Sequence, residues 1–160
     1  MPSHYSRAQI ALHWGIFLLI ALQYLFHEWI TEAWDSLRET GDFSFSPLIA
    51  GHVFGGLLIL ALVVWRIVLR LTRGAPPLPE EEPAPLKRAA AATHIGLYAL
   101  MVLMPVSGAL AWFGGIGPAA GAHGVMRILL LALVALHIAG ALYQQFVLKT
   151  DIMSRMKRAG

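Results

Sequence analysis

The 160-residue sequence contains no cysteine and few charged residues, and each shortage excludes a class of protein. Without cysteine the chain cannot form disulfides, iron–sulfur clusters, thiolate metal sites or covalently attached c-type haem. Asp, Glu, Lys and Arg make up only 13% of the residues, whereas soluble globular proteins have about a quarter. Hydrophobic residues make up 58%. The composition therefore indicates a membrane protein, and its length fits a single domain over residues 1–160.

Four stretches of the sequence are long and apolar enough to cross a bilayer, because a spanning helix needs about 20 mostly apolar residues. They cover approximately residues 8–30, 48–71, 89–113 and 125–148. The first is longer than the apolar core of a signal peptide, so we expect a retained helix there. The predicted fold is an all-α integral membrane four-helix bundle, in which residues 31–47 form a polar, acidic connection.

The placement of basic residues predicts the orientation of this bundle. Ten of the twelve Lys and Arg residues lie near the termini or around the connection between the second and third spans. Only Arg38 and Arg127 belong to the opposite side. Because cytoplasmic segments are enriched in Lys and Arg, both termini are predicted to be cytoplasmic. The basic residues cluster at the ends of apolar runs, so we expect a lipid bilayer and no nucleic acid as the partner.

Histidines are the unusual polar residues of the predicted spans. The sequence has seven, and five of them lie in or at the edges of spans, namely His13, His52, His94, His123 and His137. Ionisable residues inside a membrane are costly and usually functional. Haem iron is the commonest reason to bury several neutral imidazoles without cysteines or carboxylates. The other two, His4 and His27, are interpreted as interfacial residues without a role.

Depth in the membrane decides which histidines can act together. His123 and His137 are fourteen residues apart, which places them about 21 Å apart along one helix and within about 40° of the same face. Counting from the ends of the spans puts His13 at the inner depth of His137 and His52 at the outer depth of His123. We therefore predict two haem-ligating pairs, His13 with His137 and His52 with His123. Two histidines bound to one haem iron leave no open coordination position, which favours electron transfer over oxygen binding.

Other interpretations of these histidines stay open. Any one of them could be a hydrogen-bonded packing group between helices. Zinc is a further alternative, although its ligands must lie within about 2 Å of one ion, whereas the predicted pairs lie at opposite depths. A haem-free transporter or assembly subunit is the remaining possibility.

A second group of residues carries weaker predictions. His94 is expected to open the third helix at the inner depth, where it and Tyr98 could contact a haem propionate or a quinone; a polar interfacial role explains His94 equally well. Arg127 follows His123 by one turn and could bind a propionate, or could extend its charge to the membrane surface. Arg7, Arg66 and Arg70 could neutralise propionates, but they are interpreted first as topology or lipid-headgroup residues. Glycines inside the spans could admit a macrocycle or close helix packing: Gly55, Gly56, Gly108 and Gly140.

With these residues in view, the sequence resembles the prokaryotic cytochrome b561 family over nearly its whole length. The most specific parts are the opening motif YSRAQIALHW at residues 5–14 and the spacing of His123 and His137. Further similarity lies in Gly51-His52, residues 65–71 (WRIVLRL) with the Pro-rich stretch that follows, residues 94–98 (HIGLY), residues 105–108 (PVSG) and Leu136-His137.

The resemblance implies a multi-pass protein of the bacterial inner membrane that binds two haems b. It implies His13, His52, His123 and His137 as axial ligands, and electron exchange with ubiquinone and with a possible redox partner protein. One branch of the family acts as a superoxide:ubiquinone oxidoreductase at the periplasmic face, which is the alternative function. A surface that attracts the superoxide anion should carry positive charge. Here the first outer connection is acidic and Arg38 is its only cation, so we prefer the electron carrier.

Overall fold

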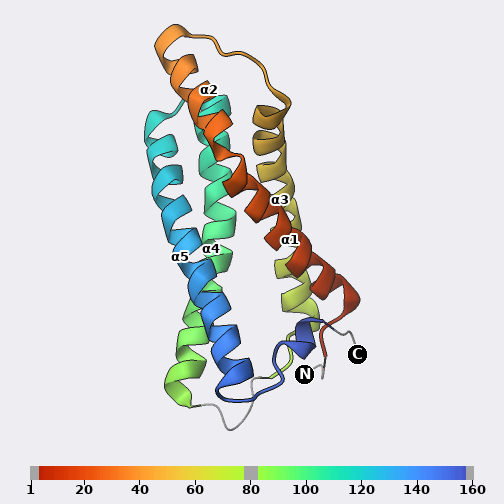
Figure 1. Ribbon diagram of the computed structural model, residues 1–160. Helices are drawn as coiled ribbons and strands as arrows, with labels where there is room; N and C mark the ends of the chain where they lie inside the picture. Colours follow the sequence, from red (N-terminus) through yellow and green to blue (C-terminus); the bar gives the residue numbers. More distant parts are fainter. Residues whose placement is uncertain (1–3, 78–82, 158–160) are drawn as a thin grey trace.

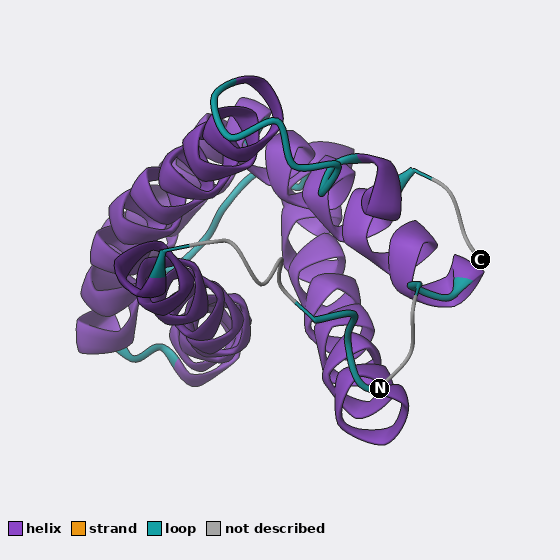
Figure 2. Cartoon of the chain, turned by 90° about the horizontal axis from the view of Figure 1, so that it is seen from below, coloured by secondary structure: helices purple, strands orange, loops and turns teal. Residues whose placement is uncertain are grey.

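The computed structural model describes residues 4–77 and 83–157, which form helices and loops without any strand in these ranges (Figures 1 and 2). The proline-rich connection expected around residues 75–83 lies partly outside the described residues. In chain order the elements are α1 (Arg7–Leu25), α2 (His27–Thr40), α3 (Pro47–Arg73), α4 (Ala84–Gly114), α5 (Gly117–Phe146) and the 3₁₀ helix η1 (Ser154–Met156).

Four of the five α-helices are long and apolar enough to cross a membrane. They are α1, α3, α4 and α5, with 19, 27, 31 and 30 residues. The prediction of an all-α protein with four apolar spans is confirmed. Two spans begin earlier than the sequence suggested, α4 at Ala84 and α5 at Gly117. Both begin beside a proline, Pro85 and Pro118, which the first turn of a helix tolerates because its N–H groups have no partner within the helix.

The first span is shorter than predicted. The sequence suggested residues 8–30, but α1 ends at Leu25 and the chain turns at Phe26, whose φ and ψ are −113° and 19°. The next residue, His27, begins α2. The apolar residues beyond Leu25 therefore belong to a separate helix, because the bend at Phe26 interrupts the regular helix.

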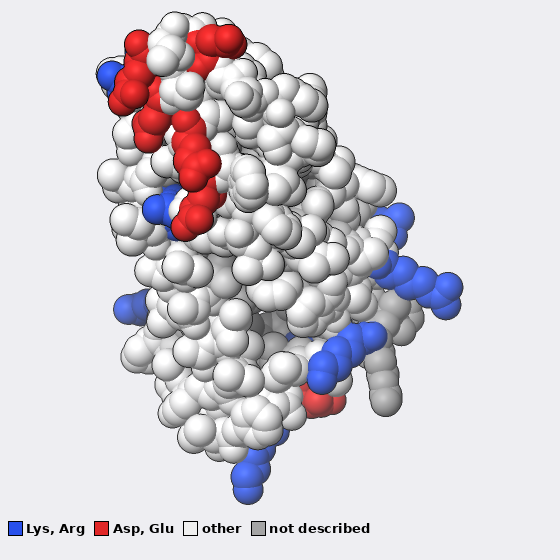
Figure 3. All heavy atoms as spheres, turned by 45° about the horizontal axis from the view of Figure 1, so that its top comes forward, with Lys and Arg blue, Asp and Glu red and all other residues white. Residues whose placement is uncertain are grey.

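Helix α2 replaces the polar connection that was predicted at residues 31–47. Its acidic residues recur every three or four positions and are all exposed, so they occupy one face. Ala33 on the opposite face is buried, and α2 packs on α3. Figure 1 shows α2 continuing from α1 across one end of the bundle, and Figure 3 shows acidic side chains gathered over it. The exposed acidic residues are Glu28, Glu32, Asp35, Glu39 and, just beyond the helix, Asp42.

The four long helices pack side by side in the order α1, α3, α4 and α5, and the most extensive contact is between α4 and α5. Leu12 and Ile16 of α1 meet Ile59 and Val63 of α3 in the main apolar cluster. Within the described residues, the backbone of α5 makes at most slight contact with α1 and α3. This separation matters because the histidines of α5 face α1 and α3 across it.

The outer surface of the bundle is apolar, as a lipid-facing surface must be. Leu71 is 79% exposed, and large apolar side chains of every long helix are exposed in the same way. The start of α1 and the 3₁₀ helix η1 both lie at the end of the bundle opposite α2 (Figure 1). We call these the terminal end and the α2 end.

Candidate functional site

The terminal end brings together histidines from α1 and α5. The ring centroids of His13 and His137 are 6.2 Å apart, with an angle of 67° between the ring planes. His94 of α4 lies at the same level, and its ring centroid is 5.2 Å from that of His137. Three helices therefore direct imidazoles into one layer of the bundle. We call His13 and His137 the terminal pair.

The α2 end contains a second pair built in the same way. The ring centroids of His52 on α3 and His123 on α5 are also 6.2 Å apart, with an angle of 65° between the ring planes. Because α5 supplies one histidine to each pair, the rise of a single helix sets the distance between the levels at about 21 Å. We call His52 and His123 the α2-end pair.

The spacing within each pair can be compared with the geometry of a shared iron ion. A metal–imidazole bond is about 2 Å long, and a five-membered ring with bonds of about 1.3–1.4 Å has a radius of about 1.1 Å. Two imidazoles on opposite sides of one ion therefore place their centroids about 6 Å apart. Both pairs fit this separation, at 6.2 Å. The 5.2 Å between His94 and His137 is about 1 Å too short for an ion between their rings.

Side-chain ligands of the protein alone do not complete a metal site here. Across residues 4–77 and 83–157, no three His, Asp or Glu side chains converge so that they could hold one metal ion. Two opposed imidazoles suit a metal whose other positions are filled by a macrocycle, and haem iron is the usual case. The residues present therefore fit haem better than zinc.

His123 is oriented by the backbone of α4. Its Nδ1 lies 2.9 Å from the carbonyl oxygen of Met104 and 3.3 Å from Oγ of Ser107. A carbonyl can only accept, so Nδ1 carries the proton and donates it, which leaves the lone pair of Nε2 free for a metal. Gly108 allows this approach, because a Cβ there would lie 3.1 Å from Cε1 and 3.2 Å from Nδ1 of His123.

His52 has no such support, since its Nδ1 is buried without a hydrogen-bond partner among the described residues. The two members of the α2-end pair thus differ in how firmly their rings are held.

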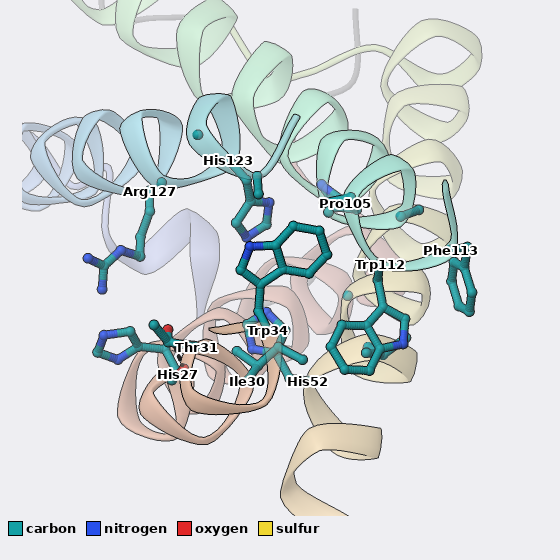
Figure 4. Close-up of a pocket in the computed structure, with 18 of the residues that line it drawn as sticks. His27, Ile30, Thr31, Trp34, His52, Pro105, Trp112, Phe113, His123 and Arg127 are labelled. Carbon is teal, nitrogen blue, oxygen red and sulfur yellow. Dashed lines mark hydrogen bonds between the residues drawn. The ribbon is translucent and has the colours of Figure 1, made fainter. Parts of the chain in front are cut away.

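A pocket of about 480 Å³ opens beside the α2-end pair (Figure 4). His52 and His123 line it, together with the small residues Gly56 and Gly108. Its volume is within the usual range for sites that bind small molecules and cofactors. Helix α2 supplies one wall, and Trp34 of α2 projects into the same space as the two histidines (Figure 4).

Sequence reasoning missed several residues of this pocket. His27 was given no role, yet it lines the pocket with Arg38 and Trp34 of α2. The regular spacing of acidic and apolar residues along α2 could have revealed that these side chains share a helix. Arg127, a candidate propionate contact from the sequence, also lines the pocket, and in Figure 4 it lies on the same side as His27.

His94 differs from its predicted position in one respect. It was expected to open the third helix, but α4 begins ten residues earlier, at Ala84, so His94 lies well inside the helix. Tyr98 follows it by one turn, and its hydroxyl accepts a hydrogen bond from Nε of Arg66 at 3.1 Å. The candidate contacts His94 and Tyr98 therefore lie at the level of the terminal pair.

Arg66 is the second residue whose role was underestimated. Its NH1 donates to the carbonyl oxygen of Gln9 at 2.7 Å, and its NH2 lies 3.4 Å from Nδ1 of His13. Gln9 itself is buried and forms a capping box with Ser6 at the start of α1. The guanidinium thus joins α1, α3 and α4 beside the terminal pair.

Comparison with known proteins shows the family of the chain. A sequence model of the family described as prokaryotic cytochrome b561 matches residues 4–159. The chain belongs to the prokaryotic cytochrome b561 family. It is accordingly a membrane electron-transfer cytochrome, and membership implies haem b as its cofactor.

Two relatives are similar over nearly their whole lengths. Cytochrome b562 of Cereibacter sphaeroides is 36% identical over 157 residues, which cover 96% of this chain and 95% of the relative. A probable superoxide oxidase CybB of Yersinia pestis is 27% identical over 183 aligned positions, covering 98% of this chain and 97% of the relative. One relative is thus named as a cytochrome and the other as a probable superoxide oxidase.

Proposed function

We propose that this cytochrome b561 binds two haems b, one at each histidine pair, and carries electrons between the ubiquinone pool and a redox partner. The observation that carries the proposal is the repeated separation of 6.2 Å between ring centroids, at two levels of one bundle. When bound, the haems would supply iron centres that take up and release one electron at a time. His13 and His137 would hold one iron, and His52 and His123 the other.

The protein contributes spacing and orientation to this function. A single rigid helix, α5, carries His123 and His137 and so keeps the two levels at a constant distance. The Met104 carbonyl directs one ligand of the α2-end pair. Arg127 faces the pocket of that pair and is proposed to bind a propionate, because a guanidinium inside a membrane needs an anionic partner. His94 and Tyr98 are proposed to contact a propionate or a quinone at the terminal level.

The orientation in the membrane is part of the proposal. We infer that the terminal end faces the cytoplasm and that the protein resides in the bacterial inner membrane. The basic residues near the termini and around the α3–α4 connection support this orientation through the positive-inside rule. Under it, the acidic face of α2 points to the periplasm.

The direct test of haem binding is an absorption spectrum of the purified protein with haem quantification. We expect a reduced-minus-oxidised spectrum typical of b-type haem and two haems per chain. Added ubiquinol should reduce part of this haem under anaerobic conditions. A preparation that is correctly inserted and folded but lacks a Soret band would contradict the proposal and favour a haem-free subunit.

The alternative function, superoxide oxidation, is favoured by the similarity to the Yersinia pestis protein and by two cations, Arg38 and Arg127, that line the α2-end pocket. Against it stand the five exposed carboxylates on and beside α2 (Figure 3). Superoxide is an anion, and a negative surface repels it before it reaches the pocket.

The two functions differ in the salt dependence of reduction by superoxide. If the acidic face repels superoxide, screening should raise the rate of haem reduction at least about threefold between 0.01 M and 0.15 M ionic strength. The triple variant Glu28→Gln, Glu32→Gln, Asp35→Asn should then react faster at low salt and show a weaker salt dependence. A wild-type rate that is high at low salt and falls as salt is added would instead indicate attraction, and would support the superoxide oxidase. Stopped-flow absorbance measures both rates.

A further inference from the structure

Arg66 lies inside a membrane span but does not extend toward the membrane surface. It is seven residues before the end of α3 at Arg73, or about 10 Å along the helix axis. Its guanidinium turns instead toward α1 and α4, where it meets Gln9, Tyr98 and His13. The residue is half-buried. An arginine that only set the topology would place its charge in the headgroup layer.

All three of these contacts are made to uncharged groups. Nε donates to the Tyr98 hydroxyl and NH1 donates to the Gln9 carbonyl, at 3.1 Å and 2.7 Å. These bonds fix the position of the guanidinium but do not neutralise its charge. A charge inside a membrane is expensive to keep and usually serves a function.

The third contact connects this fixed charge to the terminal pair. NH2 of Arg66 is 3.4 Å from Nδ1 of His13, which is longer than an ordinary hydrogen bond. A guanidinium can only donate, so a hydrogen bond here would need Nδ1 of His13 as the acceptor. When Nε2 ligates iron and Nδ1 carries the proton, the guanidinium acts on the ring through its charge alone. An iron held through Nε2 of His13 would lie one imidazole ring further from this charge, a distance at which charges still interact in surroundings of low dielectric constant.

The direction of the effect follows from charge alone. Reduction of ferric to ferrous iron adds one electron and lowers the positive charge at the metal by one. A nearby fixed cation therefore disfavours the oxidised state more than the reduced state, which raises the reduction potential. Charge, hydrogen bonds and solvent exposure are the usual determinants of haem potentials.

We propose that Arg66 is a positioning residue that holds the α1 side of the terminal pair and sets a raised reduction potential for the haem at that level. The inference rests on the proposed function, because it requires a haem between His13 and His137. It assigns to the guanidinium a role that neither lipid binding nor topology explains. It also predicts that the two haems respond differently to the loss of one charge.

The test is a spectroscopic redox titration of wild type and of the variants Arg66→Gln, Arg66→Lys and Arg73→Gln. Arg73→Gln is the matched control, since it removes an exposed cation from the end of the same helix. The haem quantification of wild type comes first. Fewer than two haems there would refute the proposed function itself, independently of any variant.

We expect Arg66→Gln to lower the ferrous-to-ferric ratio of the terminal-level haem about tenfold at the wild-type midpoint, which corresponds to about 59 mV for one electron. The other haem should keep its midpoint, and Arg73→Gln should change neither. Arg66→Lys keeps the charge without the planar fork, so it should largely retain the midpoint and change the ferric electron paramagnetic resonance signal, which reports the ligand planes.

Two results would overturn the inference. One is an unchanged midpoint in Arg66→Gln with both haems present, and the other is an equal shift in Arg73→Gln. If Arg66→Gln loses the terminal-level haem altogether, Arg66→Lys decides. If Arg66→Lys binds two haems and its terminal-level haem has a midpoint near that of wild type, the role of the charge is supported. If Arg66→Lys loses this haem, or if its ferrous-to-ferric ratio shifts tenfold, the role of the charge is contradicted.

Discussion

Replacing His137 with alanine is expected to remove one of the two haems and leave the other intact. In the proposed arrangement His137 holds the terminal-level iron together with His13, across a centroid separation of 6.2 Å. A methyl group cannot ligate iron, and a haem with one axial ligand is held much more weakly. The haem content should therefore fall from two per chain to about one, and His13→Ala should have the same effect.

His94→Ala is the control for this prediction because it removes an imidazole from the same level. The rings of His94 and His137 are only 5.2 Å apart, too close for an iron ion between them. His94→Ala should therefore keep both haems and alter only the surroundings of one. The pairing would be wrong if His94→Ala lost a haem while His13→Ala kept both, because His94 would then be the second ligand. Haem quantification and the ferric electron paramagnetic resonance spectrum distinguish these results.

Added imidazole offers a further check that loss of ligation is the cause. In His137→Gly the missing ring leaves a space of its own shape, which free imidazole can fill. Recovery of the second haem on addition of imidazole would show that the bundle is intact and only the ligand was missing. If the second haem is not recovered and helical content is lost, the variant has unfolded. The haem content of His13→Ala then tests the pairing instead.

The spans themselves could be predicted because hydropathy is a local property. Four apolar stretches of sufficient length are visible in the sequence, and all four are helices in the structure. Their ends were harder to place. Pro85 and Pro118 lie before the predicted starts of the third and fourth spans, yet each stands in the first turn of a helix, where the missing N–H costs nothing.

Depth along the helices could also be counted from the sequence. The separation of fourteen positions from His123 to His137 implies two levels, and the structure brings each of these histidines near one from another helix. Their role as iron ligands stays a prediction. Helix α2 was missed because its acidic residues suggested a loop, although Glu28, Glu32 and Asp35 have the spacing of one helical face.

The contacts of Arg66 could not be predicted in this way. A sequence shows that an arginine lies near the end of a span, and the positive-inside rule then explains it adequately. Only the packing of α1 and α4 around α3 shows that its guanidinium meets Gln9 and Tyr98 instead of the membrane surface. Contacts between helices far apart in sequence depend on helix rotation, which hydropathy does not determine.

Enlarging Gly108 is expected to affect the α2-end haem as strongly as His137→Ala affects the other. The nearest atoms to a Cβ at Gly108 all belong to the ring of His123, at 3.1, 3.2 and 4.0 Å. The ring cannot move away easily, because the Met104 carbonyl holds its Nδ1 at 2.9 Å. Alanine would require the ring to shift by a few tenths of an ångström. Leucine adds three further carbons and must displace it.

We therefore expect Gly108→Leu to lose the α2-end haem and retain the terminal-level haem, and Gly108→Ala to keep both with an altered ferric signal. Ala132→Leu is the control, since it places a leucine side chain at an exposed position of α5 that has no role in either histidine pair. It should keep two haems. Two haems with unchanged spectra in Gly108→Leu would show that His123 does not ligate iron in the observed orientation. Loss of the terminal-level haem instead would reverse the assignment of haems to levels, because Gly108 contacts a histidine of the α2-end pair alone.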